Sequence, residues 1–415
     1  MPREAPFHDL AIIGAGAAGL ATAIFGARRN PSLAVAALDG TRKLGAKILV
    51  SGGGRCNVTN DVVTPGDYQG GSSNIVRRVL NAFTVEQTVA FFRELGVRLH
   101  VEPGGKLFPD TNSARTVLEA LLAEAKRCGV KLLTDQRVTW IERRADRFEI
   151  SVPSGTLSAS SVILATGGKS LPKTGSDGTG YTFAQHLGHA LVPPVPALAP
   201  LVLEGDFHAP LAGISQEVEL AVRVEGHKPV RWRGPLLWTH FGVSGPVAMN
   251  AAGTWHRARL ENRPATVLVN FLPGADFATA ENRLVALAAS RPKLALHNGL
   301  EAWVPARVAL AVLDKLGISW QIPLAHLTRE DRRKLVHSLL NWPLPVRDSR
   351  GYNYAEVTAG GVPLDEIDPA TMESRKCPGL YLVGEILDVD GRIGGFNFQW
   401  AWSSAWVAAA GVANA

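Results

Sequence analysis

The stretch SGGGRCNVTN, residues 51–60, combines glycines with side chains that can do chemistry. Its three glycines would let the backbone approach a bound molecule, and Asn57 could hydrogen-bond a polar ring edge. Cys56 could donate a proton or act as a thiol beside that molecule. It could equally be a small residue that packs there, so both interpretations stay open. The glycine content argues against a strand or a helix, and we expect a loop.

His240, in THFGVSGP at 239–246, is a second candidate for chemistry. A histidine in a glycine-rich loop can face a substrate and exchange a proton near neutral pH. The alternative is a hydrogen-bonded structural histidine. Asp388 and Asp390 are expected to order the loop GEILDVDG rather than to react.

The elements that must position these residues begin near the N-terminus. DLAII, residues 9–13, has the composition of a short buried strand, and a helical pattern runs through Arg29. Between them lies G-x-G-x-x-G, in the strand–turn–helix context that a dinucleotide-binding site requires. The helix N-terminus would face a pyrophosphate with unpaired N–H groups and the positive end of its dipole. The predicted contacts are Gly14, Ala15, Gly16, Ala18 and Gly19.

A second strand, LAVAALD, ends at Asp39, twenty residues beyond Gly19. A carboxylate at this position can accept hydrogen bonds from the ribose hydroxyls of an adenosine. Strand, glycines, helix, strand and acid in this order predict a bound dinucleotide. At this step NAD and FAD are equally compatible with the pattern.

Two later segments favour FAD. SVILATGG, residues 161–168, reads as a buried strand that ends in a glycine turn, which is typical of two-dinucleotide-binding flavoproteins. Near the C-terminus, the strand GLYLVG leads to an acid, and a glycine loop then enters a helix. In such flavoproteins the acid binds ribitol hydroxyls, and the helix N-terminus faces the flavin edge where negative charge develops. The predicted contacts are Ala165, Thr166, Gly167, Gly384, Glu385, Gly394, Gly395, Phe396 and Asn397.

Together these motifs resemble one family, the BaiN-like and aminoacetone-oxidase-like FAD-binding oxidoreductases. The resemblance covers nearly the whole chain, residues 11 to 406. Asp39 stands where many relatives have Glu, which shortens the reach but keeps the ribose contact. The variants IGGFNF and SSAWVA put the shape of the substrate in doubt. The matching stretches are IIGAGAAGLATA, KLGAKILVSGGGRCNVTN, GKLFPDTNSA, ATGGKSLPKTGSDGTGY, THFGVSGP, VTAGGV and TMESRKCPGLYLVGEILDVDGRIGGFNFQWAWSSA.

The resemblance implies an α/β fold with a Rossmann-like FAD domain of the two-dinucleotide-binding type. It implies that residues 51–60 run along the FAD, beside the pyrophosphate and the isoalloxazine. Position 61 is Asp, so the CxxxxC redox pair of disulfide oxidoreductases is absent. The activities of the family are diverse, so the resemblance indicates the cofactor better than the substrate. It adds Val138, whose backbone would contact adenine, Lys47 and Arg55, which would offset pyrophosphate charge, and Gly53, Gly54 and Asn57.

Composition along the chain predicts that the FAD domain is discontinuous. The proline-rich stretch at 192–205 marks a boundary, and strand-like alternation follows over 201–262. Three helical patterns then occupy much of 275–340: ATAENRLVALAAS, PARVALAVLDKLG and REDRRKLVHSLLN. Such an insert usually covers the reactive face of the flavin and shapes the substrate pocket. The predicted domains are 1–192, an insert of 193–345 with a β unit (about 193–272) and a helical cap (about 273–345), and 346–415.

Bulk properties narrow the class of protein. Residues 9–27 could be mistaken for the apolar core of a signal peptide, but Glu4 and Asp9 precede the apolar residues and the glycines follow the dinucleotide-binding pattern. No other stretch of the 415 residues approaches the roughly 20 apolar residues that a membrane helix needs. The three cysteines lie far apart and none has metal-ligand spacing, which favours a soluble protein in the reducing cytoplasm. A net charge of +6 is compatible with ordinary solubility or with attraction to phosphate-bearing partners. The sequence predicts no oligomeric state.

These observations predict an FAD-dependent oxidoreductase that passes hydride between the flavin N5 and a substrate under the cap. A second G-x-G-x-x-G is absent, so NADPH or NADH would bind transiently as electron donor. The substrate would be a small molecule, such as an amine or an unsaturated carbonyl compound. RNA is the alternative, since some relatives look like ribosomal RNA dihydrouridine synthases and basic runs occur at 143–147 and 329–334. An amine oxidase, or a flavin-binding protein without turnover, are further alternatives.

Overall fold

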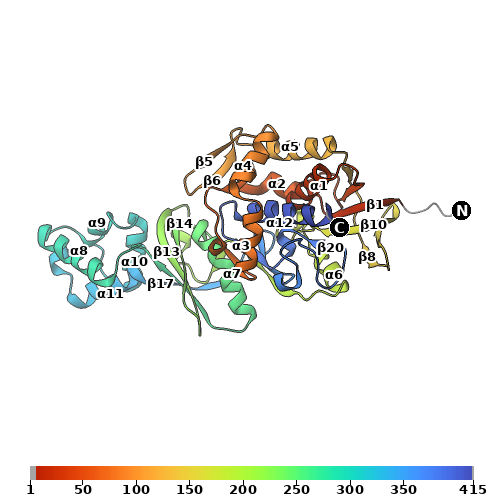
Figure 1. Ribbon diagram of the computed structural model, residues 1–415. Helices are drawn as coiled ribbons and strands as arrows, with labels where there is room; N and C mark the ends of the chain where they lie inside the picture. Colours follow the sequence, from red (N-terminus) through yellow and green to blue (C-terminus); the bar gives the residue numbers. More distant parts are fainter. Residues whose placement is uncertain (1–5, 414–415) are drawn as a thin grey trace. The chain divides into compact units, whose positions relative to one another are not determined.

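The computed structural model describes residues 6–413, which form two compact units (Figure 1). Unit 1 comprises residues 6–195 and 356–413, and unit 2 is Pro196–Ala355. The sequence placed the insert at 193–345. Unit 2 extends further toward the C-terminus because its sheet includes two late strands, β17 (Trp342–Leu344) and β18 (Val346–Ser349).

Unit 1 is built around a seven-stranded sheet. Its strands are β1 (Phe7–Ile13), β2 (Val35–Leu38), β7 (Lys131–Leu133), β8 (Trp140–Arg143), β9 (Phe148–Val152), β10 (Gly155–Leu164) and β20 (Leu380–Leu382). β1 pairs in parallel with β2 and β10, and the register places Ile13 beside both Leu38 and Leu164. Because β1, β2, β10 and β20 are parallel, the loops after their carboxyl ends meet at one edge of the sheet, where α/β folds bind ligands. The predicted Rossmann-like arrangement is confirmed.

Two helices lie side by side in unit 1, α1 (Ala17–Arg29) and α12 (Phe396–Ala413). Both are rich in alanine, a small residue and a strong helix former, so their backbones can pack closely. Phe25 of α1 contacts the ring of Trp406 of α12 edge-on, with 5.1 Å between the ring centroids. The first and the last helix of the chain therefore share one core.

The remaining parts of unit 1 surround this core and the sheet edge. Short antiparallel pairs join β3 to β6, β6 to β5, and β4 to β21, while β11 pairs with β19. The elements are α2 (Ala46–Val50), η1 (Ser51–Gly54), β3 (Thr59–Asn60), η2 (Pro65–Asp67), β4 (Tyr68–Gly70), α3 (Ser73–Ala82), α4 (Val85–Glu94), β5 (Leu99–Glu102), β6 (Lys106–Pro109), α5 (Ala114–Arg127), η3 (Pro172–Thr174), α6 (Thr179–His186), β11 (Val192–Ala197), β19 (Val357–Gly361), η6 (Leu364–Glu366), η7 (Gly384–Ile386) and β21 (Val389–Gly391).

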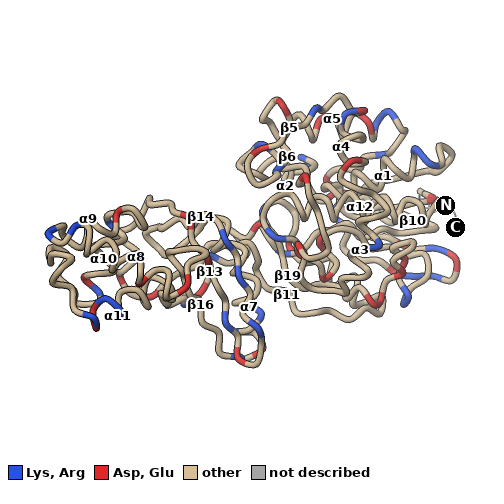
Figure 2. The backbone as a smooth tube through the Cα atoms, turned by 60° about the vertical axis from the view of Figure 1, so that its left-hand side comes forward, with Lys and Arg blue, Asp and Glu red and all other residues tan. Residues whose placement is uncertain are grey.

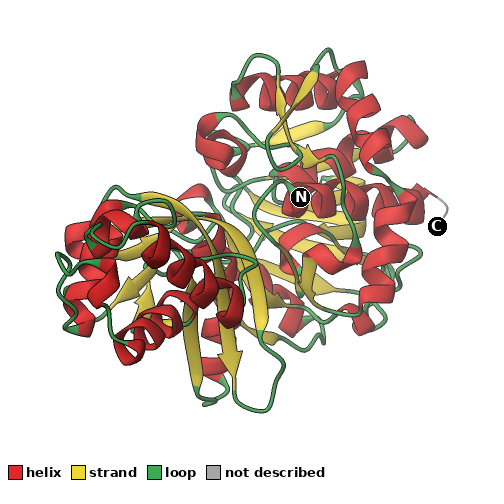
Figure 3. Cartoon of the chain, turned by 90° about the vertical axis from the view of Figure 1, so that its left-hand side faces the viewer, coloured by secondary structure: helices red, strands yellow, loops and turns green. Residues whose placement is uncertain are grey.

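Unit 2 contains its own seven-stranded sheet and its own hydrophobic core (Figure 3). The strand order is β17-β16-β13-β14-β15-β12-β18, and the pairs are antiparallel. The three helices predicted from 275 to 340 are present as α8, α10 and α11. The elements are β12 (Leu201–Leu203), η4 (Ala209–Leu211), β13 (Ser215–Val224), β14 (Val230–Thr239), β15 (Gly242–Ser244), α7 (Pro246–Leu260), β16 (Ala265–Asn270), α8 (Phe277–Ser290), α9 (Leu296–Leu300), α10 (Ala306–Leu316), η5 (Leu324–His326) and α11 (Arg329–Leu340).

The helix α7 corrects the expectation that residues 201–262 are strands. Pro246 begins the helix at a position where its missing N–H is not needed. Ala248, Ala252 and Trp255 are buried at helical spacing, and α7 packs on β13 and β14. Alternation in the flanking strands masked this alanine-rich period, and the contact with the sheet stabilises the helix.

Candidate functional site

The three glycines of the G-x-G-x-x-G loop after β1 have different roles in unit 1. Gly14 has a φ of +103°, and an added Cβ would lie 2.5 Å from the Ala165 carbonyl oxygen. A Cβ on Gly19 would lie 1.9 Å from the Gly14 oxygen. A Cβ on Gly16, by contrast, would meet no atom within 4 Å. Gly14 and Gly19 are therefore required by the packing of the chain, while Gly16 faces open space that a bound molecule can fill.

The N-terminus of α1 has the properties of an anion site. Gly16 is its N-cap, and no side chain caps the helix. The first hydrogen bond of the helix runs from Leu20 N–H to the Gly16 oxygen, at 2.9 Å. The N–H groups of the preceding turn have no partner inside the helix, and a phosphate group fits such a position. This geometry agrees with the predicted place of a pyrophosphate.

Asp39 connects the glycine loop after β1 to the loop after β2. Its Oδ2 accepts a hydrogen bond from Ala15 N–H at 3.0 Å, and its Oδ1 accepts from the N–H and hydroxyl of Thr41 at 2.9 and 2.7 Å. A carboxylate has about four acceptor positions, so about one remains for a ribose hydroxyl. The loop that carries Val138 lies close by, since Gln136 N–H donates to the Asp39 carbonyl at 2.9 Å.

The turn after β10 lies against the first loop. Ala165 N–H donates to the Ile13 carbonyl at 2.9 Å, which places Ala165 and Thr166 beside Gly14. Gly167 has a φ of +70°, and a Cβ there would lie 2.5 Å from the Ser176 hydroxyl. The predicted contacts from residues 14 to 19 and 165 to 167 therefore come together at one sheet edge.

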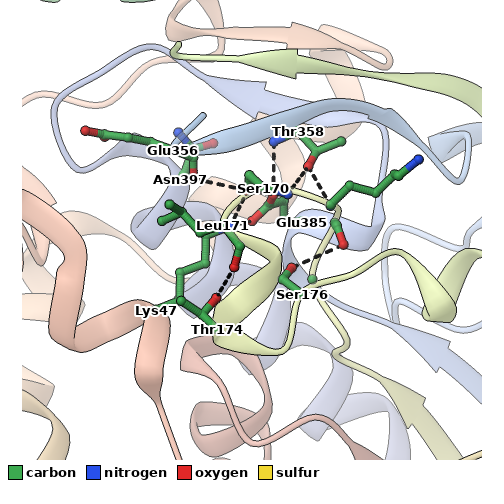
Figure 4. A network of polar contacts seen from close by, with 12 residues as sticks. Lys47, Ser170, Leu171, Thr174, Ser176, Glu356, Thr358, Glu385 and Asn397 are labelled. Atoms are coloured by element: carbon green, nitrogen blue, oxygen red, sulfur yellow. Dashed lines mark hydrogen bonds and ion pairs between the residues drawn. The ribbon is translucent and has the colours of Figure 1, made fainter. Parts of the chain in front are cut away.

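Glu385 lies in a polar network that links three distant segments of unit 1 (Figure 4). Its Oε1 accepts hydrogen bonds from the Ser170 hydroxyl at 2.8 Å and from Thr358 N–H at 2.9 Å. Lys47 forms an ion pair with Oε2 and donates to Ser170 at 2.5 Å. The structure thus gives Glu385 internal partners, and its contact with ribitol stays a prediction. Ser170 and Thr358 lie in the matching stretches ATGGKSLPKTGSDGTGY and VTAGGV, but the sequence assigned them no role, because their contact with Glu385 depends on the folded chain.

Arg55, the second predicted pyrophosphate cation, also has a carboxylate partner. Its guanidinium lies 2.6 Å from an oxygen of Glu102 and stacks over the Phe108 ring at 4.0 Å. This pair holds the arginine against β5 and β6. The pyrophosphate contact of Arg55 stays a prediction, and the structure adds Glu102 as a residue that the sequence did not reveal.

The stretch 51–60 is a 3-10 turn followed by a short strand, which refines the expectation of a loop. Gly52 and Gly53 have a left-handed backbone conformation, and a Cβ on Gly53 would meet no atom within 4 Å. The backbone of Cys56 is also in the left-handed region, with a φ of +61°, and the residue is fully buried. Burial raises the pKa of the Cys56 thiol to about 12, so the thiol is protonated at neutral pH. A protonated thiol can donate a proton but is a poor nucleophile.

Asn57 carries a buried acceptor that nothing in residues 6–413 satisfies. Its Oδ1 would lie 2.9 Å from a Cβ on Gly395, so the asparagine faces the start of α12. A buried oxygen without a donor costs about 1–3 kcal/mol, and an N–H group of a bound ring would remove that cost. Together with the space beside Gly16 and Gly53, this orphaned acceptor shows that the described residues fit a dinucleotide with a polar ring.

The residues before α12 hold its N-terminus in place. Asn397 exchanges two hydrogen bonds of 2.8 Å with the backbone of Gly391, and the Tyr68 hydroxyl donates to the Phe396 carbonyl at 2.8 Å. Gly394 and Gly395 have φ values of +132° and +95°. The structure therefore places Asn57 beside the N-terminus of α12. The side chain of Asn397 is bonded to Gly391, and its contact with the flavin stays a prediction.

His240 belongs to unit 2. It lies in the turn between β14 and β15, its side chain is exposed, and its ring contacts Phe241 edge-on at 5.1 Å. Nothing in unit 2 by itself assigns chemistry to it, and its catalytic role stays a prediction. Among the described residues, no helix is long and apolar enough to cross a membrane.

The fold as a whole matches solved flavoenzymes. The FrdA subunit of Escherichia coli quinol fumarate reductase aligns with a TM-score of 0.51 and 18% identity, over 98% of this chain and 70% of that chain. Mycobacterium smegmatis Sdh1 in complex with UQ1 aligns with a TM-score of 0.51 and 14% identity, over 99% and 69%. At this identity the match shows a shared fold, the Rossmann-like FAD-binding fold.

The family model of the HI0933-like protein Rossmann domain matches residues 8–411, so the chain belongs to the HI0933-like family of FAD-dependent oxidoreductases. The 3-dehydro-bile acid delta(4,6)-reductase of Clostridium scindens is 33% identical, over 97% of this chain and 98% of that protein. The ribosomal RNA dihydrouridine synthase of Escherichia coli is 33% identical, over 97% of both chains. The ribosomal RNA dihydrouridine synthase of Haemophilus influenzae is 34% identical, over 98% of this chain and 99% of that protein. The family resemblance seen in the sequence is confirmed.

Proposed function

We propose that the protein is an NAD(P)H-linked flavin reductase that acts on a small unsaturated molecule. One observation carries this proposal: the buried acceptor of Asn57 faces the N-terminus of α12 and has no donor of its own. A flavin ring offers that donor, and bound FAD would supply hydride transfer. The substrate class is supported by the relative named as a bile acid reductase, which is similar along the whole chain.

In this proposal each loop of unit 1 has a separate task. The N-terminus of α1 binds the pyrophosphate, and Asp39 binds the adenosine ribose. Asn57 orients the flavin ring, and the N-terminus of α12 stabilises negative charge at its edge. Lys47 and Glu385 fix the loops between these contacts.

Cys56 is the proposed proton donor. Reduction of a carbon–carbon double bond needs one hydride and one proton, and the thiol keeps its proton because burial raises its pKa to about 12. The left-handed backbone at Cys56 holds the side chain in one direction, which is how strained residues are used at functional sites. If Cys56 instead only packs at the ring, its replacement should leave reduction of the substrate nearly unchanged.

NADPH or NADH is the proposed source of electrons, bound only transiently. The chain has a single G-x-G-x-x-G, and unit 1 uses it together with α12 to build one dinucleotide site. A second nucleotide therefore has no fingerprint loop of its own and would leave after it has reduced the flavin.

A second candidate function is the reduction of a uracil ring in RNA. Two relatives bear the name ribosomal RNA dihydrouridine synthase. Unit 2 also contains 18 Lys and Arg against 13 Asp and Glu, so it carries most of the net charge of the chain. An excess of positive charge in one unit favours a phosphate-bearing partner.

The test is an anaerobic titration of the purified flavoprotein with NADPH and then with NADH, followed by flavin absorbance. Rapid bleaching supports the reductase, and single-turnover reoxidation by an enone or by ribosomal RNA then separates the two substrate classes. A flavin that stays oxidised with both nucleotides contradicts the NAD(P)H link and favours an oxidase that its own substrate, such as an amine, reduces. A flavin that no substrate reduces favours a binding protein without turnover.

A further inference from the structure

Unit 2 contains a cavity of about 330 Å³ whose lining includes none of the residues assigned to the flavin site. It is lined from four elements of the unit: Arg333 and His337 come from α11, Phe277 begins α8, Arg231 lies on β14 and Asn270 ends β16. Its volume lies at the lower end of the roughly 300–1,000 Å³ that small-molecule sites occupy. The space is therefore sufficient for one nucleotide-sized group.

The helix α11 presents two of these side chains on one face. Arg333 and His337 are four residues apart, so they project from the same side of the helix. Both contact the same ring: the Arg333 guanidinium lies 5.4 Å from the Phe277 centroid, and the His337 ring lies 5.6 Å from it. Phe277 is partly buried, so part of its ring stays exposed beside Arg333 and His337 in the cavity.

The lining carries two guanidinium groups, those of Arg231 and Arg333, and one carboxylate, that of Asp276. Arg231 pairs with Glu219, but Arg333 has no ion pair or hydrogen bond with any residue of the described chain. The carboxylate in the lining, Asp276, caps α8 by accepting from Thr279 N–H at 2.7 Å. Arg333 is thus an exposed guanidinium that remains available for an anion.

Neutral groups of the cavity add hydrogen-bonding capacity. Asn270 and Asn341 lie in the lining, and Asn341 accepts from Arg223 at 3.3 Å through its oxygen, which leaves its amino group as a donor. The backbone stretch around α11 is visibly rich in Lys and Arg (Figure 2). The basic run at 329–334, noted in the sequence, contributes Arg333 to this site.

We propose that this cavity binds a phosphorylated nucleoside, with the base against Phe277 and the phosphate on Arg333 and Arg231. One guanidinium group can bind two phosphate oxygens at once, and an aromatic ring can stack on any base. Such a group can belong to an RNA strand or to the phosphorylated adenosine of NADPH. The proposal goes beyond the flavin chemistry, because binding at this cavity does not require that NAD(P)H reduces the flavin.

The experiment measures binding of two probes to the FAD-loaded protein, a fluorescein-labelled oligouridylate by anisotropy and 2′,5′-ADP by calorimetry. The variants are Arg333→Gln and Phe277→Leu. Arg283→Gln is the matched control, because Arg283 is an exposed arginine of α8 outside the cavity lining. Unchanged flavin absorbance and melting temperature confirm that each variant is folded.

Loss of the stacking ring should weaken binding by about 5- to 150-fold, since one base–aromatic stack contributes about 1–3 kcal/mol. Loss of Arg333 should weaken it about tenfold, and for the oligouridylate it should lower the slope of log affinity against log salt by about 0.7. If only the oligouridylate responds, the ligand is RNA; if 2′,5′-ADP responds, it is the nicotinamide dinucleotide. Absence of binding of both probes overturns the proposal, and so does an equal loss in Arg283→Gln, which would indicate diffuse charge attraction.

Discussion

Lys47 on α2 and Glu385 in η7 form an ion pair across 338 positions of sequence. Ser170 accepts from the lysine and donates to the same carboxylate, so three distant segments of unit 1 are joined at one point. Both charged side chains are mostly buried. This pair couples the loops proposed to surround the flavin to the fold of the whole unit.

Lys47→Gln should destabilise unit 1 and weaken FAD binding. The change leaves Glu385 as a largely buried carboxylate without its cation, which costs about 1–3 kcal/mol. Chemical denaturation gives the free energy of unfolding, and the rise of flavin fluorescence on dilution reports release of FAD. Lys173→Gln is the control, because Lys173 is exposed in the nearby η3. Equal stability of both variants would show that the ion pair contributes nothing.

Gly19→Ala should prevent folding, whereas Gly16→Ala should weaken only FAD binding. Ala at position 19 would place Cβ 1.9 Å from the Gly14 oxygen, so this variant should not fold. Ala at position 16 meets no protein atom within 4 Å and has an extended φ of −84°, so the apoprotein should keep its stability.

The methyl group of Gly16→Ala would instead occupy the space of the cofactor. A clash of about 1–3 kcal/mol weakens FAD binding by about 5- to 150-fold. Circular dichroism of the apoprotein and FAD titration separate the two effects. An apoprotein of Gly16→Ala that is unfolded would contradict the assignment of open space at this glycine.

Cys56→Ala should separate proton donation from packing. If the thiol donates the proton, FAD binding and flavin reduction by NADPH stay normal, while reduction of the substrate slows by about a hundredfold or more. If the cysteine only packs at the ring, substrate reduction changes little. Rapid-mixing absorbance measures the two half-reactions separately.

Alkylation tests the protonation state of the same thiol. Because burial raises the pKa of Cys56 to about 12, iodoacetamide at pH 8 should leave it unmodified in the folded protein. Cys128, which is partly exposed, should be modified first. Peptide mass spectrometry after timed quenching identifies the site, and early labelling of Cys56 would refute a buried, protonated thiol.

His189 should make the stability of the protein depend on pH. Its Nδ1 lies 2.8 Å from Glu366 and its Nε2 lies 2.8 Å from the Ser374 hydroxyl, in a buried position. Burial lowers the pKa of His189 below 6.5, although the hydrogen bond to Glu366 opposes this. The unfolded chain therefore binds more protons in that window, and the free energy of unfolding falls as pH falls through 6.5 and below.

For one such histidine the slope is at most about 1.4 kcal/mol per pH unit. Burial also lowers the pKa of His8 and His256, so His189→Gln should remove only part of the dependence. Urea unfolding between pH 5 and 8 measures it, with His326→Gln as the exposed control. A steeper loss of stability in His189→Gln as pH falls would reverse the sign and contradict the prediction.

Much of unit 1 could be predicted because its signals are local. The strand before Gly14, the helix after it and the acid at the end of β2 follow from hydrophobic period and from the backbone freedom of glycine. The start of α12 near Asn397 could be predicted from the glycines that precede the helix. The helix α7 was not, because its alanine-rich face stands between strands and is stabilised only by packing on β13 and β14.

By itself the sequence determined the class of fold, the cofactor and the loops that would hold it. The partners of Glu385 and Arg55, the burial of Cys56 and the orphaned acceptor of Asn57 were decided by tertiary structure alone. So was the cavity that joins Phe277 to Arg333. The physical reason is that motifs encode short-range geometry, whereas ion pairs, desolvation and cavities depend on segments that only the folded path of the chain brings into contact.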